Sequence, residues 1–314
     1  MILLFLLTAI GFVMLSYGAV FLVDGASSLA KRLKVSQIAI GLTIVAFGTS
    51  APELIVNVVA SFKGSAEIAF GNVLGSNIFN ILIVLGVAGL IHSISVKEAT
   101  AKKEIPFLLI GTFLIFGFVN NFGFPGANLS RWDGFFIIII LIVFYFFILK
   151  DTWQDQHTEE IHSYKLLKSL FLILIGMFGL FFGAQLVVNN AIEIALRFNV
   201  SEKFIGLTVV AFGTSLPELI TSVVAVKKKH FDMAIGNIVG SNLFNLLLVL
   251  GVSSVISPMK YDLALNIDFI VLIFITIFLL ITMFIGKKYQ LEKQQAIIFL
   301  IIYGAYFIYL YFRG

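Results

Sequence analysis

The chain carries GLTIVAFGTSAPELI at residues 41–55 and repeats it as GLTVVAFGTSLPELI at residues 206–220. A second stretch, GNVLGSNIFNILIVLGV at residues 71–87, returns as GNIVGSNLFNLLLVLGV at residues 236–252. One shift of 165 residues relates both pairs without a gap. Chance similarity between apolar segments does not keep Gly, Thr, Ser, Pro, Glu and Asn in register. The sequence therefore predicts two related halves that have both kept their polar residues.

Composition places the chain in a membrane. Hydrophobic residues make up 60% of the 314 residues and charged residues only 12%, against about 25% charged residues in a soluble domain. Residues 135–149 are apolar on every face, whereas the strands of a membrane barrel alternate apolar and polar residues. The predicted fold is therefore an all-α polytopic membrane protein with ten transmembrane helices. Their centres lie near residues 12, 50, 79, 112, 141, 178, 215, 245, 275 and 302.

Basic residues alternate in number along the connections between the predicted spans. About 15 lysines and arginines fall in one set of connections and 6 in the other. The positive-inside rule makes the richer set cytoplasmic, so both termini are predicted to be extracellular in a multi-pass protein of the plasma membrane. The first five-helix repeat then covers residues 1–150, a cytoplasmic linker covers residues 151–168, and the second repeat covers residues 169–314.

Each half holds five predicted spans, which is an odd number. The second half therefore enters the membrane from the opposite side, and the chain is predicted to be an inverted-topology repeat. Such repeats build alternating-access transporters, whose substrate site lies near the bilayer midplane where the two copies meet. The architecture accordingly predicts a transporter.

Two carboxylates occupy equivalent places inside predicted spans two and seven. Glu53 and Glu218 have no lysine or arginine at comparable depth, and an ionised carboxylate in the bilayer interior costs about 2.5 kcal/mol or more. The charge must be balanced by a proton or by a bound cation. A hydrogen bond between helices would explain one such carboxyl equally well, but a symmetric pair favours cation binding.

A proline precedes each glutamate and follows a Gly-Thr-Ser turn. Pro52 and Pro217 lack an amide hydrogen, so the carbonyls of Gly48 and Gly213 lose their usual helical partners. A helix broken at this point exposes backbone oxygens. Together with hydroxyls and carboxylates they predict an oxygen-rich cage, which suits a hard cation such as Ca²⁺ or Na⁺. The hydroxyls belong to Thr49, Ser50, Thr214 and Ser215.

The second repeated stretch offers amide oxygens. Ser76 and Asn80 are four residues apart and so share one helix face, as do Ser241 and Asn245. We expect Asn80 and Asn245 to point into the cage from spans three and eight. For the other four asparagines of the motif, helix packing and ion ligation are equally favoured. These are Asn72, Asn77, Asn237 and Asn242.

Other functional classes find no support in the sequence. The chain has no cysteine, and it contains no HExxH, P-loop, GxSxG or dinucleotide-binding motif, so we expect no enzymatic activity and no cofactor. The topology explains the basic clusters, and nucleic acid is not an expected partner. Asp24, near the end of span one, aligns with Asn189 and is expected at a helix end or interface rather than in the site.

At its two repeated motifs the chain resembles the cation/Ca²⁺ antiporter superfamily, and specifically the prokaryotic sodium/calcium exchangers. The resemblance covers almost the whole chain. It implies a ten-helix fold in which two α-repeats, residues 41–90 and 206–255, form the transport core. It also implies that spans one and six slide across this core, and that the transported ions are Ca²⁺ and Na⁺.

The resemblance also implies ligands, position by position. Glu53 and Glu218 match the acidic ligands shared by both ions, and Asn80 matches the polar residue at the centre of the site. Asn245 departs from the family pattern, because some archaeal and all potassium-dependent members carry Asp there. One Ca²⁺ would neutralise the two remaining carboxylates, which predicts transport indifferent to K⁺. The resemblance further implies carbonyl ligands at Thr49, Thr214, Ala46 and Ala211 and flanking Na⁺ ligands at Ser76 and Ser241.

Three alternatives stay open at this point. The proton-coupled branch of the superfamily is the nearest, since an unpaired Glu carries H⁺ as readily as Na⁺. A passive cation channel would differ from an antiporter in lacking saturable counter-ion exchange. A purely structural membrane protein predicts that Glu53→Gln and Glu218→Gln change nothing. We expect the chain to function as a monomer in the lipid bilayer, with Ca²⁺ and Na⁺ as its partners.

Overall fold

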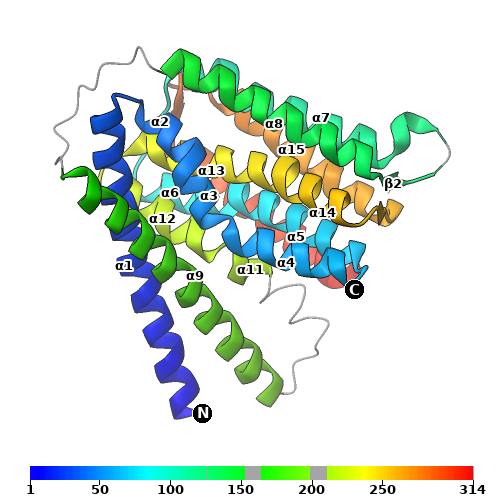
Figure 1. Ribbon diagram of the computed structural model, residues 1–314, viewed down its shortest axis with the longest axis horizontal. Helices are drawn as coiled ribbons and strands as arrows, with labels where there is room; N and C mark the ends of the chain where they lie inside the picture. The colour runs from blue at the N-terminus through cyan, green and yellow to red at the C-terminus, as the bar shows by residue number, and fades with distance from the viewer. Residues whose placement is uncertain (125, 153–163, 199–210, 314) are drawn as a thin grey trace.

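Two long helices extend away from the rest of the molecule. Helix α1 (Ile2–Leu33) and helix α9 (Leu166–Arg197) each have 32 residues and pack along each other, and one end of the pair projects beyond the other helices (Figure 1). The protein is seen here as a computed structural model. It describes residues 1–124, 126–152, 164–198 and 211–313.

Glycines bring the backbones of α1 and α9 into direct contact. A Cβ atom on Gly18 would lie 2.8 Å from the Leu180 nitrogen, and one on Gly176 would lie 2.6 Å from the Leu22 nitrogen. No real Cβ atom fits at such distances. Small residues at a helix crossing allow this close packing, which is how transmembrane helices associate without a hydrophobic driving force.

The repeated sequence stretches form the interior of the molecule as short, interrupted helices. In the first half these are α2 (Gln37–Ile40), η1 (Gly41–Val45), α3 (Ala46–Thr49), α4 (Ala51–Phe62), α5 (Ala66–Phe79), η2 (Asn80–Val84) and α6 (Leu85–Ile91). In the second half the described elements are α11 (Ala211–Thr214), α12 (Leu216–Lys227), α13 (Phe231–Leu243), η6 (Phe244–Val249) and α14 (Leu250–Ile256). The same order of elements thus appears twice.

Four further helices flank this interior: α7 (Ile105–Val119), α8 (Arg131–Thr152), α15 (Asn266–Thr282) and α16 (Lys293–Arg313). Helix α7 packs with α15, α8 with α14, and α16 with α6. In Figure 1, α7, α8 and α15 run along one side of the molecule. Short helical turns precede or follow these helices at η3 (Thr100–Glu104), η4 (Asn121–Gly123) and η7 (Leu263–Leu265).

Two small antiparallel strand pairs join segments from different halves. Strand β1 (Ile94–Ser95) pairs with β4 (Gln290–Leu291), with Ile94 opposite Leu291. Strand β2 (Asn128–Leu129) pairs with β3 (Met259–Lys260), with Asn128 opposite Lys260. Each pair therefore ties the first half of the chain to the second through main-chain hydrogen bonds.

The described residues are predominantly helical, as the sequence predicted. Six of their helices are long and apolar enough to cross a membrane, and the bent pair Gln37–Thr49 and Ala51–Phe62 supplies a seventh span. The other predicted centres, near residues 112, 141 and 215, fall in α7, in α8 and at the junction of α11 with α12. The count of ten spans and their inverted topology stay predictions.

The linker predicted at residues 151–168 stays a prediction, because only its two ends lie in the described part of the chain. Helix α8 ends at Thr152 and helix α9 already begins at Leu166, so helix occupies both ends of that interval. Residues 153–163 lie outside the described part of the chain. Arg32 at the end of α1 donates to the Tyr164 carbonyl at 2.7 Å, which places the start of α9 beside the end of α1.

Candidate functional site

Both Gly-Thr-Ser turns before the glutamates break their helices. Helix α3 ends at Thr49, and α4 begins at Ala51 after a bend of 50°. Ser50 between them has φ −84° and ψ 6°, and its counterpart Ser215 has φ −92° and ψ 5°. The prolines stand in the first turns of α4 and α12, where a missing amide hydrogen is tolerated. The predicted helix break is thus present in both halves.

The glycines of the two turns contact helix α9. A Cβ atom on Gly48 would lie 2.6 Å from the Met177 Cε atom, and one on Gly213 would collide with the Val188 side chain. These glycines therefore admit α9 against both broken helices. Pro52 and Pro217 are buried beside them. Because proline has no amide hydrogen, the carbonyls of Gly48 and Gly213 lack the helical donor that any other residue would supply.

The serines in the breaks connect each half to the acid of the other half. Ser50 Oγ donates to Glu218 Oε1 at 2.9 Å, and Ser215 Oγ donates to Glu53 Oε1 at 3.2 Å. Ser76 Oγ donates to the same Glu53 oxygen at 3.3 Å. All five side chains are buried, with Glu53 and Glu218 at 0% exposure. The two repeats therefore form one polar cluster.

The threonines of the turns also reach across the cluster. Thr49 Oγ1 lies 3.2 Å from Ser241 Oγ and donates to Asn237 Oδ1 at 3.0 Å. In the symmetric position, Thr214 Oγ1 donates to Asn72 Oδ1 at 3.4 Å. The structure thus brings Thr49, Ser241 and Thr214 into the same network as the glutamates.

Five buried side-chain oxygens of this cluster have no hydrogen-bond partner. They belong to Glu53 Oε2, Glu218 Oε2, Asn77 Oδ1, Asn80 Oδ1 and Asn245 Oδ1, and all five residues are at 0% exposure. A buried unpaired oxygen costs free energy, so such groups call for a ligand. Among the described residues, no lysine, arginine or histidine is buried. The arrangement offers oxygen donors and negative charge, which is the donor set for a hard cation.

Asn72 and Asn237 are held within the protein. Asn72 Nδ2 donates to Asn57 Oδ1 at 2.7 Å, while its own oxygen accepts from Thr214. Asn237 Nδ2 likewise donates to Ser222 Oγ at 3.0 Å. With both ends of each amide engaged, these asparagines orient the threonines. Sequence reasoning missed Asn57 and Ser222, although each stands four residues after a glutamate and so shares its helix face.

Asn77 and Asn242 pair with each other across the two halves. Asn77 Nδ2 donates to the Asn242 carbonyl at 3.3 Å, and Asn242 Nδ2 donates to the Asn77 carbonyl at 3.4 Å. Asn80 Nδ2 adds a bond to Asn242 Oδ1 at 3.1 Å. Its counterpart Asn245 has neither amide atom bonded. Asn77 and Asn242 thus join the two halves through their amide nitrogens, while Asn77 Oδ1 has no hydrogen-bond partner. The symmetry of the sequence is broken at Asn80 and Asn245.

The two alanines of the candidate set differ in what can be described. The Ala46 carbonyl accepts from the Ser50 amide at 2.9 Å and lies 3.2 Å from Thr49 Oγ1. Because the single Thr49 hydroxyl hydrogen is donated to Asn237, one lone pair of this carbonyl stays available for a ligand. Ala211 is the first residue of α11, and the residues that precede it lie outside the described ranges.

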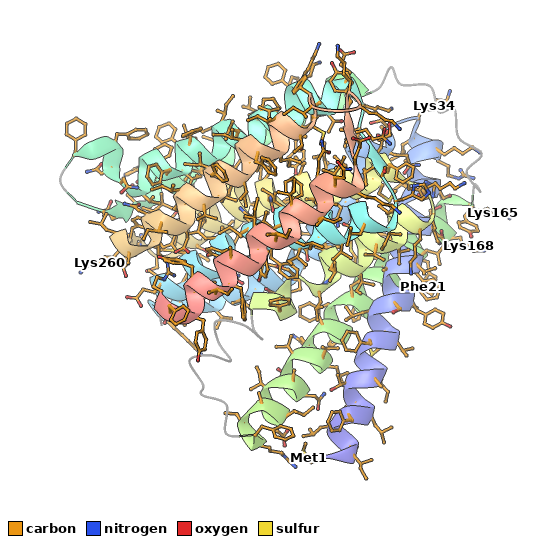
Figure 2. The ribbon with its side chains drawn as sticks, turned by 180° about the vertical axis from the view of Figure 1, so that it is seen from behind. Met1, Phe21, Lys34, Lys165, Lys168 and Lys260 are labelled. Carbon is orange, nitrogen blue, oxygen red and sulfur yellow. The ribbon has the colours of Figure 1, made fainter. Side chains whose placement is uncertain are left out.

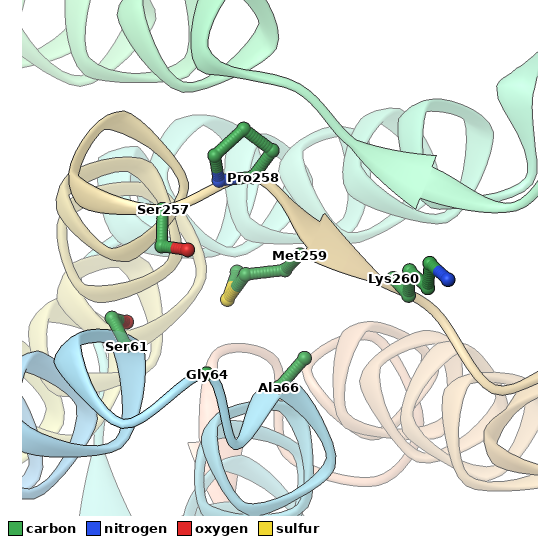
Figure 3. A pocket seen from close by; sticks show the side chains of 7 residues that line it. All are labelled: Ser61, Gly64, Ala66, Ser257, Pro258, Met259 and Lys260. Atoms are coloured by element: carbon green, nitrogen blue, oxygen red, sulfur yellow. The ribbon is translucent and has the colours of Figure 1, made fainter.

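A separate cavity lies outside this cluster. It measures about 250 Å³ and sits between the α4–α5 turn and the segment after α14 (Figure 3). Ser61, Ser257 and Lys260 supply its polar side chains. It has no carboxylate and carries a lysine, so its chemistry differs from that of the cluster and does not suit a cation.

Comparison with known proteins gives consistent matches. A family model described as sodium/calcium exchanger protein matches residues 3–150 and 168–312. The chain is 36% identical over 283 residues to the inner membrane protein YrbG of Escherichia coli, with 86% of each chain covered. It is 28% identical over 345 residues to the sodium/calcium exchanger MaX1 of Methanosarcina acetivorans, with 98% of each covered. It is also similar to a solved structure of the sodium-calcium exchanger NCX_Mj soaked with 10 mM Na⁺ and zero Ca²⁺, with a TM-score of 0.84 and 32% identity over 96% of this chain and 97% of that chain.

Proposed function

The chain belongs to the sodium/calcium exchanger protein family, and we propose that it is a secondary antiporter that exchanges Na⁺ for Ca²⁺ across the plasma membrane. The observation that carries the proposal is the group of unpartnered oxygens that includes those of Glu53, Glu218, Asn80 and Asn245. They are buried in a part of the molecule where no described cationic side chain is buried. A bound cation satisfies these oxygens and balances the carboxylates.

Charge and ligand type favour Ca²⁺ and Na⁺ as the transported ions. Both ions are hard and prefer oxygen ligands, and one Ca²⁺ neutralises two ionised carboxylates. Several Na⁺ ions can occupy overlapping oxygens and provide the same charge. The proposed ligands are side-chain oxygens of Glu53, Glu218, Asn80, Asn245, Ser76 and Ser241, with backbone carbonyls of Thr49, Thr214, Ala46 and Ala211.

Competition for one cage gives coupled exchange without covalent chemistry. An empty cage holds two buried negative charges, which are costly in a low-dielectric interior. The protein therefore changes access readily only when Ca²⁺ or Na⁺ fills the cage. The ions shift the population of two conformations through their differential binding. Helices α1 and α9, which pack mainly on each other, are the elements proposed to slide across the core.

We further propose ten transmembrane helices in an inverted repeat, with both termini outside the cell and the connection between α8 and α9 inside. Figure 2 supports this orientation, since Lys34, Lys165 and Lys168 lie together at one end of the α1 and α9 pair while Met1 lies at the other. A basic end of this kind favours the cytoplasmic side. The proposal takes the functional unit as a monomer.

The proposal includes independence of K⁺. Asn245 is a neutral amide, so the cage holds two carboxylates and reaches neutrality with one Ca²⁺ alone. A third carboxylate at this position would leave one negative charge for a further monovalent cation. Exchange is therefore expected to run equally well with and without K⁺.

Ca²⁺ flux into proteoliposomes tests the proposal. Vesicles containing the purified protein are loaded with Na⁺, K⁺, choline or acid, and uptake of radioactive Ca²⁺ is followed in each. Uptake only with internal Na⁺ supports sodium/calcium exchange. Uptake driven by internal acid assigns the protein to proton-coupled exchange, and uptake indifferent to the counter-ion indicates a channel. A strict requirement for K⁺ would contradict the role given to Asn245.

A further inference from the structure

An ion pair joins helix α1 to the helix that carries Glu218. The Lys228 Nζ atom lies 2.5 Å from Asp24 Oδ1, and the two side chains are 31% and 32% exposed. Lys228 directly follows α12, and α1 packs along α12. The pair therefore holds α1 against the core at the end of α12 farthest from Glu218.

The repeat has no equivalent pair in the other half. The shift of 165 residues places Asn189 of α9 at the position of Asp24, and Lys63 after α4 at the position of Lys228. The lysine is kept, but the acid is replaced by a neutral amide. Within the described residues, Asn189 and Lys63 are both exposed and neither forms a salt bridge. The two halves thus differ in one side chain of this pair, Asp24 in the first half and Asn189 in the second.

The packing of the two long helices is asymmetric in the same sense. Helix α1 lies along α12, whereas α9 makes little contact with α4 among the described elements. In an inverted repeat, exchanging the conformations of the two halves generates the state that faces the other side of the membrane. In that state α9 packs along α4 and brings Asn189 to Lys63, while α1 moves away from α12.

We infer that the Asp24–Lys228 ion pair is a positioning contact that stabilises the access state described here over the opposite one. The inference rests on the proposed alternating access. The opposite state gains no ion pair in exchange, because Asn189 carries no charge. The identity of residues 24 and 189 therefore sets the resting balance between the two access states.

A change in this balance shifts the apparent affinity for Ca²⁺ in opposite directions on the two faces. Only the fraction of molecules open to a given face binds ions from it, so apparent affinity follows that fraction. The proposed topology places Lys228 on the cytoplasmic side. The ion pair therefore keeps α1 packed against α12 at that side and keeps the cytoplasmic access closed. Asp24→Asn is expected to lower the half-saturating Ca²⁺ concentration on the cytoplasmic face and raise it on the outer face, by about two- to five-fold, as suits a half-exposed ion pair.

Three variants test the inference in proteoliposomes with Ca²⁺ applied to one face at a time. Asp24→Asn keeps the side-chain shape and removes the charge. Asn189→Asp supplies the missing partner for Lys63 and is expected to shift both affinities in the same sense as Asp24→Asn, since it stabilises the opposite state. Glu193→Gln removes the ion pair of Glu193 with Arg197, at 2.6 Å within α9, and serves as the matched control without an effect. Equal shifts on both faces, or none in Asp24→Asn and Asn189→Asp, would overturn the inference.

A second measurement does not depend on transport. The chain has no cysteine, so Lys63→Cys gives a single thiol on the α4 side, which a membrane-impermeant thiol reagent labels from outside. Labelling is expected to slow when Asp24→Asn is added, because α9 then covers this position more often, and to stay constant with Glu193→Gln. An unchanged rate with Asp24→Asn contradicts the inference. Absence of Na⁺-dependent uptake in the otherwise unmodified protein contradicts the proposed exchange itself.

Discussion

Ser215 in the second half of the chain donates a hydrogen bond to Glu53 in the first half, with 3.2 Å between Ser215 Oγ and Glu53 Oε1. Ser50 forms the reciprocal bond to Glu218 at 2.9 Å. Each helix break thus orients the acid of the other repeat and occupies one of its oxygens. The second oxygen of each carboxylate is left for a ligand, so neither half builds the cage alone.

Replacing either glutamate is expected to abolish Ca²⁺ transport. Glu53→Gln or Glu218→Gln removes one of the two charges that balance a divalent ion, and each should reduce uptake by about 100-fold or more, since a buried unbalanced charge costs several kcal/mol. Radioactive Ca²⁺ uptake at matched protein amounts measures the effect. Glu67→Gln, at an exposed carboxyl of α5, is the control. Exchange retained in either site variant would falsify the ligand assignment.

Removing the serines of the helix breaks is expected to weaken ion binding without abolishing it. Ser50→Ala and Ser215→Ala each delete one hydrogen bond to a carboxylate, which contributes about 1.5–3 kcal/mol. The half-saturating Ca²⁺ concentration should rise about ten-fold in each variant. Ser254→Ala removes a buried hydroxyl that donates to the Gly251 carbonyl at 3.0 Å and leaves the cage intact. A shift of equal size in this control would show that the effect is one of general packing.

Adding a carboxylate at Asn245 is expected to make exchange sensitive to pH. In Asn245→Asp the Ca²⁺-loaded cage keeps one negative charge when all three acids are ionised, and protonation of one acid restores neutrality. Ca²⁺ flux in this variant should therefore rise as the pH falls, while the unmodified protein varies less over the same interval. Flux measured at several pH values with equal pH on both sides of the membrane distinguishes the two. A flat profile in Asn245→Asp would argue against a place for residue 245 in the cage.

Enlarging a glycine between α1 and α9 is expected to impair both stability and transport. In Gly18→Val the new side chain meets the α9 backbone, because even a Cβ atom would lie 2.8 Å from the Leu180 nitrogen. Overpacking of this kind costs about 1–3 kcal/mol. Thermal unfolding in detergent and Ca²⁺ uptake both report the change. Gly304→Val is the control, since a Cβ atom there has no neighbour within 4 Å; an equal loss in the control would show that the crossing of α1 and α9 is not the cause.

Much of the fold follows from sequence patterns that depend on one helix at a time. The apolar windows predicted where helices lie, and the Gly-Thr-Ser-x-Pro-Glu pattern predicted the breaks at Ser50 and Ser215. Long apolar runs and prolines act locally, so one sequence is sufficient to see them. The ends of helices follow less directly from a single sequence, because they depend on contacts with other segments, such as that of Arg32 with the Tyr164 carbonyl.

The hydrogen-bond pattern of the site could not be predicted in the same way. The hydrogen bond from Ser50 to Glu218 joins the two halves of the chain. It depends on how the halves pack against each other, which the sequence of a single helix does not determine. The difference between Asn80, bonded to Asn242, and Asn245, whose amide atoms have no partner, depends likewise on how the two halves pack against each other. A repeat in sequence predicts symmetric partners, whereas a transporter in one state is asymmetric.

The strand pairs β1 with β4 and β2 with β3 have a consequence for how such chains diverge. Their contacts are formed by main-chain groups, with Ile94 opposite Leu291 and Asn128 opposite Lys260. Main-chain hydrogen bonds form with almost any side chain present. The two halves are thereby joined in a manner that tolerates substitution at the exposed positions Ser95, Asn128 and Lys260, whereas the buried Ile94 and Leu291 must keep their apolar packing while the buried oxygens keep their positions.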